Sequence, residues 1–185
     1  GFIERLLSRP EFETVVVSTN INLRSIRYLP YDDPDVAVWI SRDLDSTLNM
    51  RERVAVDEWL ASGSALHLMH DNRQHGWPVL AGMFGVVNDR AFSIAERMCK
   101  LADQLKNPGK YDMDATYAEK IILEHFRHSY LQHYGAGYQH EAHRSFPPLP
   151  SGVKSGKVGE IVNVRRVYTT MKLEERWSSL SHLSN

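Results

Sequence analysis

The feature that most constrains the fold is a run of apolar residues, 36–40 (VAVWI), that leads directly into a charged segment. Such a continuous run is typical of a strand that is covered on both faces. It passes into Asp43 and Asp45, and the pattern of residues 49–61 predicts a helix directly after them. Ligands of α/β sheets bind beyond the carboxyl ends of strands. The sequence therefore predicts a ligand site at Asp43 and Asp45.

Strand-like segments alternate with helical patterns along the rest of the chain, which predicts the α/β class. We expect further strands over residues 14–19, 24–29, 65–69 and 160–164, a turn at residues 31–34, and helices over residues 49–61, 90–106 and 112–128. Gly82 and Gly85 interrupt the apolar segment 78–87 and indicate either a close approach to the backbone or a bend. We expect one domain over residues 1–165 and a helical or flexible tail over residues 166–185.

Composition excludes several classes of protein. The 185 residues are enough for one domain with a core, and a net charge of −1 gives no basic excess for nucleic-acid binding. No apolar run approaches the ~18 residues of a membrane-spanning helix. Cys99 is the sole cysteine, so no disulfide forms within the chain and a reducing compartment is favoured. We expect a cytoplasmic protein, although a fragment from the Golgi lumen also fits. The oligomeric state stays open.

The two aspartates have the chemistry of a site for a hard divalent cation. Side chains two residues apart on an extended segment point the same way, so Asp43 and Asp45 can aim their carboxylates at one point. Mn²⁺ or Mg²⁺ bound there would accept phosphate oxygens as further ligands and help a diphosphate to leave. Two other Asp-x-Asp pairs have simpler explanations, a turn for residues 33 and 35 and a helix cap for residues 112 and 114. A cap or turn is also the alternative for Asp43 and Asp45.

Residues 28–87 resemble a family of GT-A-like glycosyltransferases in the order and spacing of several segments. The matching segments are Arg42-Asp43-Leu44-Asp45-Ser46, Glu58-Trp59-Leu60, His67-Leu68-Met69-His70-Asp71 with His75, and Ala81-Gly82-Met83-Phe84-Gly85. The chain departs from the family pattern at four positions. His70 replaces Arg, Ala81 replaces Gly, Phe84 replaces Trp, and Ala115 stands where Gln is typical after the Asp that Asp114 matches.

The resemblance implies a GT-A-like, Rossmann-related mixed sheet flanked by helices. Only a short lead-in precedes residue 14, which leaves open whether the first β-α unit of that fold is present. The resemblance also implies a metal-dependent glycosyltransferase. Such an enzyme moves a sugar from a nucleoside-diphosphate donor to a hydroxyl of a glycan or other acceptor, as in polysaccharide biosynthesis. The cofactor would be manganese or magnesium, held by Asp43 and Asp45.

The resemblance also suggests roles for other residues. Arg42 and Arg51 flank the acidic pair and would contact phosphate oxygens, because the arginine fork suits phosphate. Asp71 and Asp114 would act on the sugar or acceptor side, with Asp114 as the candidate catalytic base. A histidine late in the chain, His133 or residue 140, would complete the metal site.

Each of these roles has a structural alternative. The arginines can form salt bridges with Asp43, Asp45 or Glu52. The resemblance implies that His67, Asp71 and His75 shape the acceptor or donor-sugar pocket, but these polar residues can instead satisfy backbone groups. The histidines at 125, 128, 133, 140 and 143 suit either a zinc site or a polar surface.

Two other functions stay open on the sequence alone. The first is a catalytically inactive domain of the same fold that binds a glycan or a protein partner. The second is a metal-dependent hydrolase that uses the histidine cluster. We expect Trp59 and the helix over residues 49–61 to be scaffold in either case.

Overall fold

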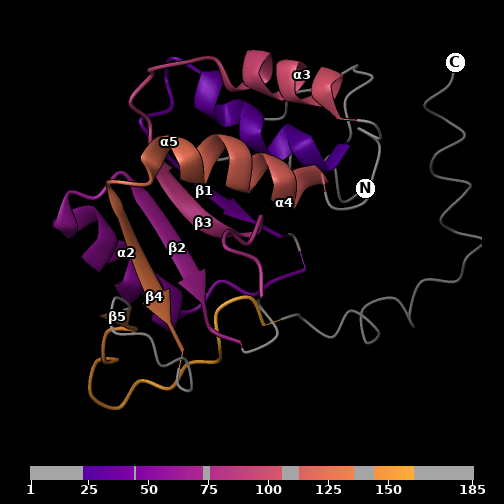
Figure 1. Cartoon of the computed structure of the whole chain (residues 1–185). Coiled ribbons are helices and arrows are strands. Elements are labelled where there is room, and N and C mark those ends of the chain that lie inside the picture. The colour runs from indigo at the N-terminus through magenta and orange to yellow at the C-terminus, as the bar shows by residue number, and fades with distance from the viewer. Residues whose placement is uncertain (1–22, 44, 73–75, 106–112, 136–143, 161–185) are drawn as a thin grey trace, which may run out of the picture. The chain divides into compact units, whose positions relative to one another are not determined.

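The computed structural model describes residues 23–43, 45–72, 76–105, 113–135 and 144–160, and these residues form a mixed five-stranded sheet flanked by helices (Figure 1). The strands are β1 (Val38–Arg42), β2 (Leu66–His70), β3 (Met83–Val87), β4 (Tyr130–Tyr134) and β5 (Arg144–Ser145), in the order β1-β3-β2-β4-β5. β3 runs antiparallel to β1 and β2, whereas β4 runs parallel to β2 and β5. The predicted α/β class is confirmed.

Helices cover both faces of the sheet (Figure 1). On one face, α2 (Met50–Ser62) contributes Ala55 to a buried cluster with Met69 and Met83. The other face is covered by η1 (Leu23–Asp32), α3 (Ile94–Gln104) and the consecutive helical segments α4 (Met113–Tyr117), η2 (Ala118–Leu123) and α5 (Glu124–Phe126). There Leu68 and Phe84 belong to the larger of the two apolar clusters formed by the described residues.

The prediction of a strand over residues 24–29 is wrong, because this segment forms the 3-10 helix η1. Ser25, Tyr28 and Tyr31 follow one another at a spacing of three residues, and all three are buried. A 3-10 helix has three residues per turn, so this spacing places them on one face. Tyr28 stacks on Phe84 with ring centroids 6.0 Å apart, which fixes η1 against the sheet.

The apolar run at residues 36–40 does lead into a strand, β1, two residues further on than expected. The prediction that both faces of this strand are covered is wrong. Trp39 is buried, but Val38 and Ile40 on the opposite face are 43% and 37% exposed. Within the described residues β1 pairs only with β3, so it forms one edge of the sheet.

The helix predicted over residues 49–61 is confirmed as α2. The Asn49 side chain accepts a hydrogen bond from the backbone N–H of Glu52, and Gly63 ends the helix with a left-handed φ of 73°. Trp59 is fully buried and donates its indole N–H to the carbonyl of Ser64, at 2.8 Å, as expected of scaffold. Glu52, in the first turn of α2, is buried in an ion pair with Arg42.

β4 was not predicted, and the helical segment before it ends at Phe126 instead of residue 128. Its sequence, YLQHY, has neither a continuous apolar run nor a clear alternation, and its parallel pairing with β2 provides the register that makes it a strand. The strands expected over residues 14–19 and 160–164 and the tail over residues 166–185 lie outside the described residues, apart from Glu160, which is in no strand. In the described part of the chain, no helix is long and apolar enough to cross a membrane.

Candidate functional site

A cavity of about 290 Å³ lies at the carboxyl end of β1. We call it the carboxylate cavity, because Asp43 and Asp45 line it after β1 and Asp114 lines it from the first turn of α4. The structure therefore brings three of the predicted site residues together. The full lining is Arg27, Asp43, Asp45, Ser46, Leu80, Ala81, Gly82, Met83, Asp114 and Gly159.

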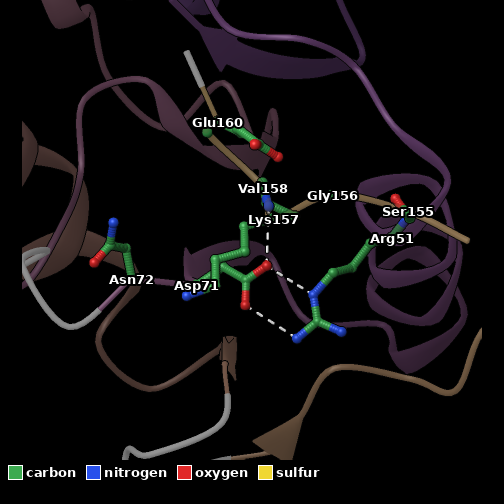
Figure 2. Close-up of a pocket in the computed structure, with 9 residues that line it drawn as sticks. Arg51, Asp71, Asn72, Ser155, Gly156, Lys157, Val158 and Glu160 are labelled. Atoms are coloured by element: carbon green, nitrogen blue, oxygen red, sulfur yellow. Dashed lines mark hydrogen bonds and ion pairs between the residues drawn. The ribbon is translucent and has the colours of Figure 1, made fainter.

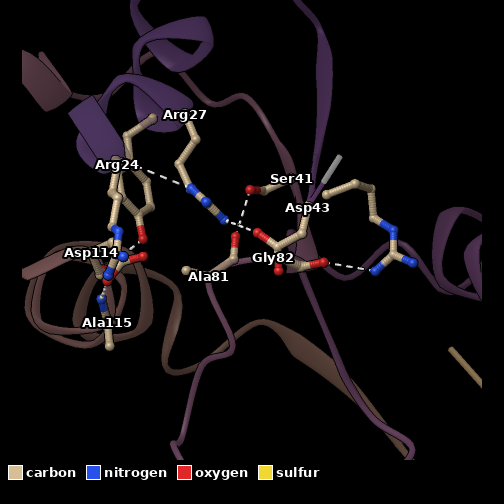
Figure 3. A network of polar contacts seen from close by, with 10 residues as sticks. Arg24, Arg27, Ser41, Asp43, Ala81, Gly82, Asp114 and Ala115 are labelled. Atoms are coloured by element: carbon tan, nitrogen blue, oxygen red, sulfur yellow. Dashed lines mark hydrogen bonds and ion pairs between the residues drawn. The ribbon is translucent and has the colours of Figure 1, made fainter. Parts of the chain in front are cut away.

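Contacts between β1 and the segment before β3 hold this end of the sheet in place (Figure 3). Ser41 donates its hydroxyl to the carbonyl of Ala81 at 2.5 Å, and Arg42 Nη1 donates to the carbonyl of Gly82 at 2.7 Å. A Cβ atom at Gly82 would lie 2.2 Å from Asp43 Oδ2, so any larger residue would displace the carboxylate. The close approach predicted from this glycine is confirmed.

Gly85, within β3, also lies too close to a neighbouring side chain to carry a Cβ atom. A Cβ atom there would lie 2.8 Å from the ring of Trp59. The two glycines of residues 78–87 therefore make room for different neighbours, a carboxylate at the cavity and an indole in the interior.

The carboxylates of the cavity differ in their partners. Asp43 is 46% exposed and forms an ion pair with Arg27, with Nη1 and Oδ1 2.9 Å apart (Figure 3). Asp45 is exposed, and within the described residues no hydrogen bond or ion pair engages its side chain. The backbone N–H of Ser46 donates to the carbonyl of Asp43 at 3.1 Å, so this segment is also a turn. The cap of α2 is Asn49, so neither Asp43 nor Asp45 serves as the helix cap.

Asp114 lies across the cavity from the β1 end. Its Oδ1 accepts the backbone N–H of Ala115 at 2.9 Å, and its backbone carbonyl accepts the Tyr28 hydroxyl at 2.6 Å. Burial raises the pKa of Tyr28, and the charge of Asp114 adds to the effect, so this hydroxyl stays protonated and remains a donor. Arg27 and Tyr28, adjacent on η1, thus contact both sides of the cavity.

The carboxylate oxygens of this cavity suit a hard divalent cation that binds together with a phosphate-containing ligand. Among the described residues, no group of three or more His, Cys, Asp or Glu side chains is arranged to hold a metal ion. Mg²⁺ and similar ions are often held by one or two carboxylates together with phosphate oxygens and water. Asp43 and Asp45 fit that pattern, whereas zinc sites in proteins are built mainly from histidine nitrogen and cysteine sulfur.

His133, the predicted third ligand, lies elsewhere. It is buried in β4, and it does not line the carboxylate cavity. Its Nδ1 lies 2.8 Å from His67 Nε2, and its Nε2 lies 3.3 Å from a carboxylate oxygen of Glu58. Burial lowers the pKa of both imidazoles, that of His67 to about 3, and the His67 ring stacks on Trp59. Both rings are therefore neutral parts of the interior.

Asp71 and Arg51 pair with each other in a second cavity, of about 600 Å³ (Figure 2). Arg51 donates to both oxygens of Asp71, at 2.7 and 3.0 Å, and the backbone N–H of Val158 donates to Asp71 at 2.9 Å. The Asp71 side chain is only 2% exposed. Arg51 thus forms a salt bridge, but with none of the three carboxylates expected. Asp71 satisfies a backbone group, as its structural alternative predicted.

Arg42 also has a structural role. Its Nε lies 2.8 Å from Glu52, the partner that the salt-bridge alternative names. Burial raises the pKa of Glu52, and Arg42 offsets part of this effect. Of the two arginines predicted to contact phosphate, each is therefore occupied by an ion pair, and Arg27 is the guanidinium that the structure places at the carboxylate cavity. No local motif marks Arg27, because η1 brings it there through its 3-10 geometry.

Comparison of the chain with models of protein families, with curated proteins and with solved structures gave no match in any of the three searches. The geometry of the site and the sequence pattern therefore carry the functional interpretation.

Proposed function

We propose that this chain is a metal-dependent glycosyltransferase that uses a nucleoside-diphosphate sugar. The observation that carries the proposal is the carboxylate cavity at the end of β1, which gathers Asp43, Asp45 and Asp114 from two distant segments of the chain. Its described lining holds three carboxylates against one guanidinium, so the cavity attracts cations. The resemblance of residues 28–87 to GT-A-like transferases supports the same function.

The chemistry assigns each group a task. Asp43 and Asp45 would hold Mn²⁺ or Mg²⁺, which offsets the negative charge of the diphosphate as it leaves. A glycosidic bond forms between the acceptor oxygen and the anomeric carbon, while the bond from that carbon to the phosphate oxygen breaks. The diphosphate departs with the electron pair. The acceptor proton passes to a carboxylate, for which Asp114 is the candidate.

Calorimetric titration of UDP- and GDP-sugars, with and without Mn²⁺, tests this function. We expect one donor class to bind in a metal-dependent way, and the variant Asp43→Asn/Asp45→Asn to lose that binding by at least tenfold. Asn keeps the shape of Asp and still accepts a hydrogen bond from Arg27. A loss would therefore report the missing charge.

The chain offers a matched control in its other described Asp-x-Asp pair, Asp33 and Asp35, which is exposed in a turn. The variant Asp33→Asn/Asp35→Asn removes the same two charges away from the cavity and should bind the donor as the native chain does. Equal losses in both variants would show a general charge effect and contradict the proposal. Absence of donor binding in the native chain would reject it outright.

A binding domain without transferase activity is the second candidate. It is favoured by one observation, namely that the two arginines expected to contact phosphate, Arg42 and Arg51, form ion pairs with carboxylates of the chain itself. Slow hydrolysis of the bound donor separates the two functions, because a working transferase loses some sugar to water. Metal-dependent donor binding with no hydrolysis over a day would favour the binding domain.

A further inference from the structure

The cavity that contains Arg51 and Asp71 adjoins the carboxylate cavity. Residues 155–160 form one wall of it, so we call it the loop cavity; its lining is Arg51, Asp71, Asn72, Ser155, Gly156, Lys157, Val158, Gly159 and Glu160. Gly159 lines both cavities. It has a left-handed φ of 76°, and a Cβ atom there would lie 2.7 Å from Met83 Sδ. Gly159 therefore borders both cavities without a side chain, and a ligand in one would lie close to a ligand in the other.

The wall formed by residues 155–160 is fixed at several points. Val158 is buried in the apolar cluster with Met83 and Phe146, and its N–H donates to Asp71. The side chain of Asn49 donates to the carbonyl of Lys157 at 2.9 Å. Two further bonds reach this segment from the chain around the start of α2, from Arg51 N to Ser155 Oγ at 3.2 Å and from Thr47 N to Glu160 O at 3.2 Å. The loop cavity is thus formed without a ligand, which lowers the cost of binding one.

The charges of the loop cavity cancel. Two cations, Arg51 and Lys157, face two anions, Asp71 and Glu160. The Asp71 carboxylate already accepts hydrogen bonds from Arg51 and from the backbone N–H of Val158, as Figure 2 shows. The carboxylate cavity, with three anions and one cation, is by contrast negative. A charged ligand gains little in the loop cavity, whereas donors and acceptors on its polar side chains suit a ligand with many hydroxyl groups.

We infer that the loop cavity binds the acceptor as a neutral, polyhydroxylated saccharide and presents one of its hydroxyls past Gly159 to the carboxylate cavity. Its volume of about 600 Å³ lies within the usual size range of ligand cavities. The assignment of an acceptor rests on the proposed function. The binding of a neutral saccharide does not require turnover, so the two fail separately.

A charge-neutral double variant tests this inference. Lys157→Ala/Glu160→Ala removes one cation and one anion from the loop cavity and leaves the ion pair of Arg51 with Asp71 in place. We expect the KM for a saccharide acceptor to rise at least tenfold, while hydrolysis of the donor by water stays within twofold of the native rate. Glu96→Ala/Lys100→Ala is the matched control, because it removes an exposed ion pair from α3 and lines neither cavity. It should leave both rates unchanged.

Unchanged transfer in the loop-cavity variant, or an equal fall of transfer and hydrolysis, would overturn the inference. A second measurement holds even if the chain proves inactive. The native chain is titrated with cellohexaose and maltohexaose, and with an oligogalacturonate of equal length, while backbone amide chemical shifts are followed by NMR. Shifts at Asn72, Lys157 and Gly159 with a neutral hexasaccharide, lost in the double variant, would support the inference. Binding of the oligogalacturonate alone, or of no saccharide, would reject it.

Discussion

The carboxylate cavity and the loop cavity lie on either side of Gly159 and contain the same kinds of side chain, yet they use them in opposite ways. In the loop cavity, Asp71 accepts three hydrogen bonds and is almost fully buried. In the carboxylate cavity, Asp45 is exposed, and no group in the described part of the chain engages it. A carboxylate that the protein itself satisfies contributes to stability, and one left open is available to a ligand. Substitution of Asp71 should therefore lower mainly the stability of the chain, and substitution of Asp45 should affect mainly ligand binding.

The largest expected effect is on folding stability. Asp71→Ala should lower the free energy of unfolding by about 3–5 kcal/mol, because it leaves Arg51 partly buried without its partner and Val158 N–H unpaired. Asp45→Ala should change it by no more than about 0.5 kcal/mol, as is usual for exposed residues. Urea denaturation of both variants measures the difference. Similar values for the two variants would contradict the contrast between the cavities.

The second effect is the dependence of stability on pH. His67 is buried and neutral, with its pKa lowered to about 3, whereas an unfolded imidazole titrates near 6.5. As pH falls below about 6.5 the unfolded chain takes up protons that the folded chain does not, so stability is lost progressively toward pH 3. Each such imidazole contributes up to about 1.4 kcal/mol per pH unit.

Unfolding of the native chain and of His67→Gln between pH 6 and pH 4 measures this contribution. Both proteins share the same carboxylates, so the variant should show a slope lower by about one proton. Equal slopes would mean that His67 is protonated in the folded protein.

A smaller effect should follow from filling the wall between the cavities. Gly159→Ala should cost about 2–3 kcal/mol, from the left-handed backbone and from the contact with Met83. Gly152 has a similar φ of 80°, but nothing lies within 4 Å of its Cβ position. Gly152→Ala should therefore cost only about 1–2 kcal/mol. Thermal unfolding of both variants isolates the contact with Met83, and equal costs would show that Gly159 is not confined by it.

The smallest effect should be stabilisation by metal. At ten times its dissociation constant, Mn²⁺ should add about 1.4 kcal/mol to the free energy of unfolding by binding only the folded chain. Asp43→Asn/Asp45→Asn should abolish this gain, and Asp33→Asn/Asp35→Asn should keep it. If Asp71→Asn abolished the gain while the Asp43 and Asp45 variant kept it, the roles of the two cavities would be reversed.

The sequence predicts the parts of this contrast that depend on neighbours along the chain. The apolar run before Asp43 and the helix after it have local signatures, and Gly82 and Gly85 mark close approaches that the structure confirms. Contacts between residues far apart in the chain cannot be predicted from these local patterns. Nothing near Arg51 indicates that its partner is Asp71, because β2 must first be placed beside α2. His133 was misplaced for the same reason, since its strand becomes recognisable through its register with β2.

One regularity in the sequence does indicate η1. Ser25, Tyr28 and Tyr31 repeat every three residues, which matches neither a strand nor an α-helix but fits the 3-10 helix that the structure contains. A period of three in a short segment with two tyrosines is the local signal for η1. The position of Arg27 beside Asp43 depends instead on how η1 packs against the sheet, which this period does not give.

Through η1, the separation between the two sides of the carboxylate cavity depends on aromatic packing in the core. Arg27 contacts Asp43, Tyr28 contacts the backbone of Asp114, and the Tyr28 ring lies against Trp39 and Phe84. A change of ring size at Phe84 would therefore alter the spacing of the acidic groups without altering any of them. Because Mg²⁺ demands shorter and stricter bonds to oxygen than larger cations do, a cation bound there as proposed would be selected in part by the aromatic packing under η1.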